Sequence, residues 1–188
     1  MGAKLHKAPA REGVAVRLPE LEEAIVAELV RPGSDGVLQV PVQTLEPEVT
    51  QEQLAGRHPE YIAIDRSSFR LRLYDDLELA KTYTIAVGQA GYATPGGTYE
   101  IQTKQVNPTW TAPNAPWTGD LAGQSFPPGP GNPLKARWMG FLGGAGIHGT
   151  DELDSLGTAA SHGCIRMAIP DVIELYDHVE VGAPVHIA

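Results

Sequence analysis

Residues 146–167, GIHGTDELDSLGTAASHGCIRM, contain two of the six histidines of the chain together with its only cysteine. A cysteine attacks as the thiolate, and a nearby imidazole can take its proton and pass it to a leaving amine. His162 stands two residues before Cys164, so the two side chains share a face of an extended segment. His148 lies 16 residues upstream and can meet the thiol only through the fold. The pattern predicts a Cys–His acyl-transfer site with either imidazole available as its base.

Glycines next to these residues suit the same chemistry. Gly163 separates His162 from Cys164 and leaves backbone N–H groups accessible to an oxyanion. Gly149 follows His148, and its uncluttered carbonyl can fix the tautomer of the imidazole. The segment therefore supplies a nucleophile, a base and peptide donors for a tetrahedral intermediate.

Two other interpretations of this segment compete with acyl transfer. A buried cysteine beside histidines can be ordinary core packing, although a segment rich in Gly, Ser, Thr and His makes a poor core. The other is a zinc site, which no C-x-x-C or H-E-x-x-H pattern supports. Its ligands would be His148, His162 and Cys164, with a fourth from Asp151, Asp154 or His178.

Composition narrows the classes of protein that this chain can represent. Its 188 residues suffice for one full-sized domain and a small appendage, and 42% hydrophobic residues support a packed core. A formal net charge of −9 argues against a nucleic-acid partner and against adsorption to anionic lipid. A single cysteine excludes an internal disulfide. Residues 1–30 lack the apolar stretch of a signal peptide.

Residues 1–57 show less regular patterning than the rest of the chain, and none before residue 18. Residues 1–17 are expected to form a flexible leader. A small α+β segment should follow over residues 18–57, with a helix at its start, a strand around 37–42 and a short helix after Thr50. This segment is too small for a core of its own. It is expected to be the tail of a preceding domain or an element packed on the main one.

From residue 58 to residue 188 the pattern changes to alternating β-structure. Strands are predicted around 69–74 and 83–87, and residues 139–148 suit one buried central strand. A helix with Pro170 in its first turn is expected near the C-terminal end. The fold class is therefore mostly β with one or two short helices.

Residues 107–133 do not fit regular structure. They hold seven prolines, four glycines and the tryptophans Trp110 and Trp117. A loop of this length in a compact domain is usually functional or disordered. Either the aromatic residues form a lid or wall over a substrate, or they pack the loop onto the sheet.

The motif SHGCIRM, Ser161 to Met167, resembles the signature of the L,D-transpeptidases, whose YkuD-type catalytic domain acts on the bacterial cell wall. The family also has an upstream histidine at the end of a glycine-rich strand, which GIHG matches at His148. The ATPGGTYEI stretch looks like the Thr-Pro-x-Gly turn of that family. The resemblance covers about residues 60–188 and implies a YkuD-like β-sandwich. Residues 18–57 resemble the end of a peptidoglycan-binding module.

The resemblance implies a role for each residue of the motif. Cys164 would be the nucleophile, present as a thiolate near neutral pH, and His148 its general base and acid. The Gly149 carbonyl would orient His148, and N–H groups around Gly163 would hold the oxyanion. The remaining residues would shape the substrate site: His162, Ser161 and Arg166.

The implied role of Arg166 is open between two alternatives. It would bind a substrate carboxylate or make structural hydrogen bonds behind the site. Lys135 and Arg137 are weaker candidates for carboxylate binding, with a merely solvated side chain as the alternative for each.

The resemblance further implies a substrate, a location and inhibitors. Cys164 would attack the third residue of a peptidoglycan tetrapeptide stem, release D-alanine and pass the acyl group to a second stem, which gives a 3→3 cross-link. No metal or organic cofactor is needed, and β-lactams of the carbapenem type would acylate the thiol. The work would take place outside the cytoplasmic membrane, after export by a signal or anchor not present in this chain.

Three other functions remain open for the same residues. Water as the acceptor would make the protein an L,D-carboxypeptidase, and a protein lysine would make it a protein-to-peptidoglycan ligase. A non-catalytic module that binds peptidoglycan stems belongs to a different class, against which the complete His148 and Cys164 pair argues. The sequence does not predict the oligomeric state.

Overall fold

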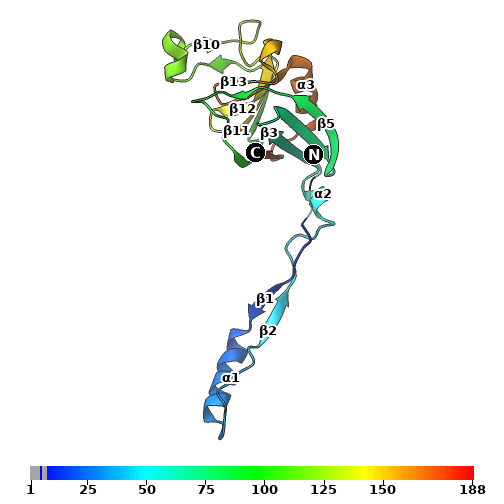
Figure 1. Cartoon of the computed structure of the whole chain (residues 1–188), viewed down its shortest axis with the longest axis vertical. Coiled ribbons are helices and arrows are strands. Elements are labelled where there is room, and N and C mark those ends of the chain that lie inside the picture. Colours follow the sequence, from blue (N-terminus) through cyan, green and yellow to red (C-terminus); the bar gives the residue numbers. More distant parts are fainter. Residues whose placement is uncertain (1–4, 6–7) are drawn as a thin grey trace. The chain divides into compact units, whose positions relative to one another are not determined.

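The computed structural model describes residue 5 and residues 8–188 (Figure 1). The chain divides into two compact units, a larger one over Ala55–Ala188 and a smaller one that ends at Leu54. The division falls a few residues before the boundary expected at residue 58. No helix in the described part of the chain is both long and apolar enough to cross a membrane.

The smaller unit contains two strands joined through a helix. Strand β1 (Gly13–Val16) pairs antiparallel with β2 (Val42–Leu45), and α1 (Leu18–Val30) lies between them in sequence. The helix begins at residue 18 as predicted, with a proline in its first turn, yet none of its residues is buried. A short helix, α2 (Leu54–Arg57), follows Thr50 as expected.

Two predictions for this unit are wrong. Strand β2 begins at Val42 and not at residue 37, because its pairing with β1 starts there. The predicted flexible leader contains strand β1, because pairing with a distant segment orders residues that show no periodicity of their own. The rest of that prediction, for residues 1–4 and 6–7, lies outside the described residues. The likeness of residues 18–57 to a peptidoglycan-binding module stays a prediction.

A five-stranded mixed sheet forms one layer of the larger unit. Its order is β5 (Glu78–Thr84), β4 (Arg70–Asp75), β3 (Glu60–Asp65), β15 (Pro184–Ile187) and β7 (Gly97–Glu100). All neighbours are antiparallel except β15 and β3. The predicted alternation is present on β4, where Leu71 and Leu73 are buried. The hairpin from β4 to β5 turns at Asp76 and Leu77, both with positive φ.

A four-stranded sheet forms the second layer and carries the motif. Its order is β14 (Ile165–Ala168), β12 (Ala145–Thr150), β11 (Arg137–Leu142) and β8 (Thr103–Val106). Strands β12 and β14 are parallel, and the other pairs are antiparallel. The prediction of one strand over residues 139–148 is wrong, because Gly143 and Gly144 turn the chain between β11 and β12. Gly143 has φ +51, a left-handed conformation that favours glycine.

Shorter elements complete the larger unit. Helix α3 (Ile169–His178) packs on the four-stranded sheet, with Pro170 in its first turn as predicted. Two small ladders join β6 (Val87–Gly88) to β13 (Ala159–Ser161) and β9 (Trp110–Thr111) to β10 (Ser125–Phe126). The 3₁₀-helices are η1 (Pro116–Leu121) and η2 (Leu153–Ser155).

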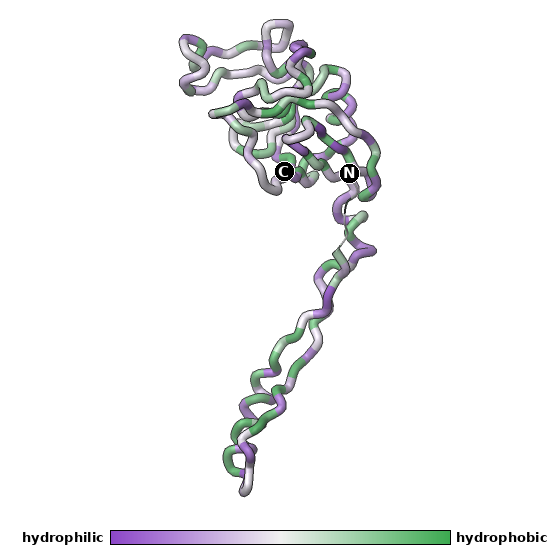
Figure 2. The backbone as a smooth tube through the Cα atoms, in the orientation of Figure 1, coloured by the Kyte–Doolittle hydropathy of each residue, from purple (hydrophilic) through white to green (hydrophobic). Residues whose placement is uncertain are grey.

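One hydrophobic core lies between the two sheets and α3. Its buried side chains come from both sheets and from the helix, and include Ile62, Leu71, Phe141, Ile147 and Leu175. Apolar residues accordingly gather on the central strands of the larger unit (Figure 2). The fold is mostly β with few helices, which confirms the fold class expected from the sequence.

Candidate active site

Four side chains of the four-stranded sheet form a row across its strands. Gln105 on β8 pairs with Trp138 on β11, Trp138 pairs with His148 on β12, and His148 pairs with Arg166 on β14. On β11, β12 and β14, neighbours of these residues along the strands, Met139, Ile147, Ile165 and Met167, belong to the core and are fully buried. Because successive side chains of a strand face opposite sides, the row lies on the face away from the core.

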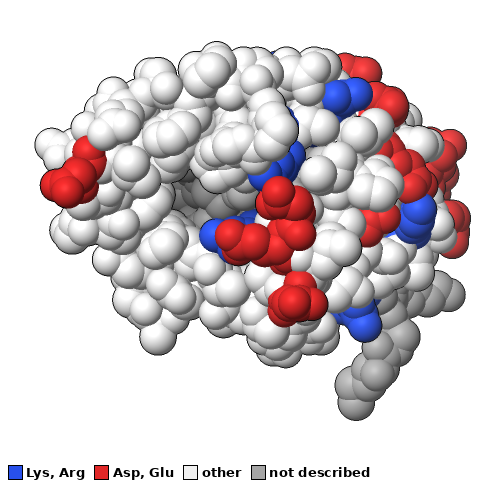
Figure 3. Space-filling view, turned by 90° about the horizontal axis from the view of Figure 1, so that it is seen from above, with Lys and Arg blue, Asp and Glu red and all other residues white. Residues whose placement is uncertain are grey.

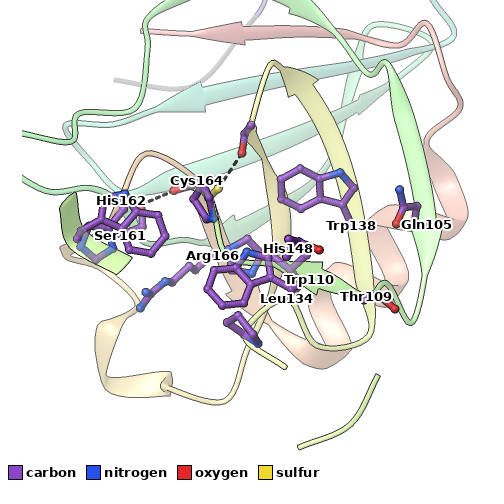
Figure 4. Close-up of a pocket in the computed structure, with 15 residues that line it drawn as sticks. Gln105, Thr109, Trp110, Leu134, Trp138, His148, Ser161, His162, Cys164 and Arg166 are labelled. Atoms are coloured by element: carbon purple, nitrogen blue, oxygen red, sulfur yellow. Dashed lines mark hydrogen bonds between the residues drawn. The ribbon is translucent and has the colours of Figure 1, made fainter. Parts of the chain in front are cut away.

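This face of the sheet forms the floor of a cavity of about 360 Å³. All four residues of the row line it, together with Ser161, His162 and Cys164 (Figure 4). The opposite wall comes from the proline-rich loop, through Thr109, Trp110, Thr111, Pro113, Trp117 and Pro133. The loop therefore borders the cavity, as one of the two interpretations of residues 107–133 predicts. Seen from this end of the molecule, the surface is hollowed, and basic and acidic side chains meet at the rim (Figure 3).

Cys164 stands immediately before β14 and is half-buried. Its thiol lies 3.8 Å from the carbonyl oxygen of Gly144, in the turn between β11 and β12. The turn that presents the thiol needs Gly163, whose φ of +111° is one that side-chain-bearing residues rarely adopt. Cys164 and His148, although 16 residues apart in the sequence, thus line the same cavity.

Ser161 stabilises the turn at residues 161–164 through its side-chain hydroxyl. Its hydroxyl donates a hydrogen bond to the Cys164 carbonyl at 2.5 Å and accepts one from the Gly163 N–H at 3.1 Å. The side chain is buried, with 1% of the residue exposed. The Gly163 N–H, expected from the sequence to be accessible to an oxyanion, is therefore already hydrogen-bonded within the turn.

The ring of His148 is oriented by the peptide that follows it. Its Nδ1 lies 2.8 Å from the carbonyl oxygen of Gly149, the contact expected from the sequence. A carbonyl only accepts hydrogen bonds, so Nδ1 carries the proton of the neutral ring. Nε2 then has a free lone pair and is the nitrogen that can act as a base.

Burial determines the charge of His148. The residue is 6% exposed, and loss of hydration lowers its pKa to about 4. The carbonyls of Gly149 and Pro133 oppose this shift of the pKa, whereas the positive charge of Arg166 adds to it. The imidazole is therefore neutral at pH 7, the form in which it can accept a proton.

Burial also raises the pKa of the Cys164 thiol above its ordinary value. A hydrogen bond from the backbone of Gly146 and the charge of Arg166 lower this pKa only in part. This direction of the pKa is opposite to the thiolate that the family resemblance implies near neutral pH. The half-buried thiol and the buried imidazole each favour the neutral form, because each loses hydration in the fold.

His148 should make the protein lose stability in mild acid. The unfolded chain takes up the His148 proton near pH 6.5, but the folded chain does so only near pH 4. Between these values the unfolded state binds more protons, so the free energy of unfolding falls as the pH falls. The expected loss is about 3 kcal/mol below pH 4. Denaturant titrations at a series of pH values measure it. The His148→Gln variant should lack this component, and equal pH dependence in both proteins would contradict the buried neutral ring.

His162 lies in the opposite wall of the cavity. Its ring stacks on Trp117 at 4.3 Å between ring centroids and 10° between planes. Tyr92 meets it edge-on at 4.9 Å, and Gln89 approaches its Nε2 at 3.4 Å. Trp117 in turn stacks on Trp110. His162 therefore connects the proline-rich loop to the segment after β6.

The basic candidates are divided between the cavity and its surroundings. Arg166 lines the cavity and forms an ion pair of 2.7 Å with the exposed Glu152. Lys135 pairs with Asp151 at 2.7 Å and does not line the cavity. Arg137 lies over the ring of Tyr176, so the structure leaves Arg166 as the basic side chain in the site.

Three candidate ligands of the alternative zinc site, His148, His162 and Cys164, line the same cavity but are not grouped to hold a metal ion. In residues 5 and 8–188, no group of three or more His, Cys, Asp or Glu side chains is arranged to hold a metal ion. The histidine of the SHGC motif is instead part of an aromatic stack.

Two residues of the site were missed by the sequence interpretation. Trp138 and Gln105 line the cavity on the side of His148 away from Arg166 (Figure 4). A one-strand interpretation of residues 139–148 hides the cross-strand pairing that brings Trp138 next to His148. A correct hairpin with its turn at Gly143 would have indicated this neighbour.

Comparison with known proteins assigns the larger unit to a family. Residues 59–187 match the family model described as YkuD, the L,D-transpeptidase catalytic domain. The match covers most of the chain, so the protein belongs to the L,D-transpeptidase family. This confirms the resemblance that the SHGC motif indicates.

Individual relatives agree with this assignment. The chain is 33% identical over 170 residues to the "Probable L,D-transpeptidase ErfK/SrfK" of Escherichia coli, covering 86% of this chain and 52% of that sequence. The ertapenem-acylated catalytic domain of the E. faecium L,D-transpeptidase is 27% identical, with a TM-score of 0.55, over 70% of this chain and 98% of that one. L,D-transpeptidase 3 of Mycobacterium tuberculosis, with a faropenem-derived adduct, shares the fold at 19% identity and a TM-score of 0.56, over 69% of this chain and 60% of that chain. The chain thus spans about half of the E. coli relative.

Proposed function

We propose that this protein is a cysteine-dependent L,D-transpeptidase that forms 3→3 cross-links between peptidoglycan stem peptides. The observation that carries the proposal is the cavity that Cys164 and His148 share, with His148 held by the Gly149 carbonyl. The family assignment supports the reaction class. The fine specificity rests on the resemblance of the SHGCIRM motif.

The first half-reaction forms a thioester on Cys164. The sulfur attacks the carbonyl carbon of the third stem residue while its proton passes to Nε2 of His148. The resulting oxyanion is stabilised by the peptide N–H of Cys164, because Ser161 occupies that of Gly163. His148 then donates its proton to the amine of the leaving D-alanine, and the tetrahedral intermediate collapses to the acyl-enzyme.

The second half-reaction transfers the acyl group to the acceptor stem. The acceptor amine attacks the thioester, gives its proton to Nε2 of His148 and forms a new amide bond. The sulfur leaves and recovers its proton from the imidazolium. His148 begins each half-reaction as the neutral imidazole and returns to it after passing through the imidazolium, and no step needs a metal or an organic cofactor.

Arg166 has two alternative roles in this site, binding of a substrate carboxylate and structural support. It lines the cavity, where a guanidinium can bind a carboxylate of the stem in a bidentate manner. Its ion pair with Glu152 favours the structural alternative until a substrate displaces that carboxylate. The substrate implies that the protein works outside the cytoplasmic membrane.

Products from purified stems test the proposal. Tetrapeptide stems incubated with the enzyme should give a dimer that has lost one D-alanine, detected by mass. A tripeptide as the sole product would indicate an L,D-carboxypeptidase, and coupling only to an added protein lysine would indicate a protein ligase. Stems that bind to the protein but stay unchanged would indicate a non-catalytic binding module.

The aromatic wall should control access to Cys164. Trp117→Ala removes the ring that stacks on His162, and aromatic contacts of this kind contribute about 0.5–1.5 kcal/mol. We expect kcat/KM for the stems to fall up to about tenfold, with a smaller change in Tm than a core substitution causes. Leu121→Ala, an exposed residue of η1, is the control. An unchanged kcat/KM in Trp117→Ala would mean that the loop of residues 107–133 only packs onto the sheet and does not control access.

A further inference from the structure

Trp138 lines the cavity but has no role in the two half-reactions described above. It is the direct cross-strand neighbour of His148, on the side away from Arg166. The indole and imidazole rings lie 6.2 Å apart between centroids, with 26° between their planes. Figure 4 shows Trp138 on the right of His148, opposite the side that holds His162 and Ser161.

The sheet is built to seat this indole flat across its strands. A Cβ at Gly146 would lie 2.5 Å from the indole Cη2, and a Cβ at Gly140 would lie 3.1 Å from Nε1. Any side chain at Gly146 would therefore displace the ring. Gly146 follows the turn whose Gly144 carbonyl lies 3.8 Å from the Cys164 thiol, and its backbone lowers the pKa of that thiol. The far edge of the indole thus lies over the start of the strand that borders the nucleophile.

We propose that Trp138 is a positioning residue that holds the imidazole of His148 toward Cys164 and keeps water away from the pair. The inference rests on the proposed function, in which these two residues carry the reaction. The indole over Gly146 covers the sheet beside His148, on the side away from Arg166. A dry site favours the neutral imidazole and strengthens its hydrogen bond to the Gly149 carbonyl.

Few charged groups act on His148, so a change in its pKa can be interpreted. Arg166 on β14 is the charged side chain that acts on it, and the carbonyls of Gly149 and Pro133 are its polar contacts. On the other side, β11 and β8 face it with the neutral Trp138 and Gln105. Substitution of Trp138 therefore changes hydration and packing around the ring without changing a charge.

The experiment is an NMR titration of the His148 imidazole in the full chain. Wild type should titrate near pH 4, and Trp138→Ala should move the midpoint up by about one unit or more, toward the ordinary value near 6.5. Trp138→Phe, which keeps an aromatic ring, should restore part of the shift. The Nδ1-protonated tautomer should also become less populated in Trp138→Ala. Acylation of Cys164 by ertapenem should slow about tenfold or more.

Trp117→Ala is the matched control, because it removes the other indole that stacks on a histidine of this cavity. It should leave the His148 midpoint in place. If Trp138→Ala keeps the wild-type midpoint and tautomer, the inference is overturned, whatever happens to the rate. Should Trp138→Ala fail to fold, Trp138→Phe and Trp138→Leu decide by the same two readouts. A wild type that ertapenem never acylates would refute the proposed function instead, since the titration of His148 does not depend on turnover.

Discussion

Incubation with ertapenem is expected to add the mass of the drug to the wild-type chain and to leave Cys164→Ala at its unmodified mass. The strained lactam carbonyl resembles the scissile amide of a stem, and the thiol that opens it stays bonded to the acyl group. Cys164 is the only cysteine, so no other thiol can substitute for it. The related E. faecium domain has been observed acylated by ertapenem. Intact-protein mass spectrometry measures the adduct directly.

The variant must remain folded for this result to have meaning. Cys164 is half-buried and does not belong to the hydrophobic core, so Cys164→Ala should keep its circular dichroism spectrum and most of its Tm. Arg70→Lys, on the five-stranded sheet, is a folded control that should acquire the adduct normally. A folded, reduced wild type that never gains the drug's mass would leave Cys164 as a structural thiol.

His148→Gln should slow acylation by about 10²–10⁴, the usual range for loss of a general base. The effect is expected to be large because the resting thiol is neutral, so its proton must be taken during the attack. The wild-type rate should be steady near neutral pH and should fall as the pH drops through the pKa of His148, about 4. A protonated imidazole has no lone pair with which to accept a proton. Single-turnover kinetics of adduct formation across this pH range measure both effects.

The other imidazole of the motif provides the control. His162→Gln keeps the base and loses the stacking on Trp117, so its acylation should slow much less than that of His148→Gln. Equal losses in the two variants would contradict the assignment of a single base. A larger loss in His162→Gln would make His162 the base and His148 a residue of the cavity floor.

Local sequence was sufficient for much of the framework. Helix α1 and helix α3 were predicted because apolar residues recur at helical spacing and prolines stand in their first turns. The alternation on β4 predicted which side chains face the core, since the period of two is a property of the extended chain itself. Residue types and glycines around Cys164 predicted the reaction class, because a thiol, imidazoles and bare peptide groups have few other combined uses.

Other features depended on contacts between distant segments. Strand β1 shows no periodicity and exists through its pairing with β2. The turn at Gly143 places Trp138 beside His148, which no pattern within one strand reveals. The hydroxyl of Ser161 takes the N–H of Gly163 because the turn closes over it.

The sequence by itself predicts which groups react, and the tertiary structure decides the surroundings in which they are held. Cys164 and His148 are predicted from residue type, spacing and family resemblance. Whether the pair is charged depends on how much water reaches it, and that is set by the sheet, the loop and the neighbouring Arg166. Hydration is a property of the packed fold and has no signature along the chain. Burial in the packed fold therefore favours the neutral form of both groups over the expected thiolate.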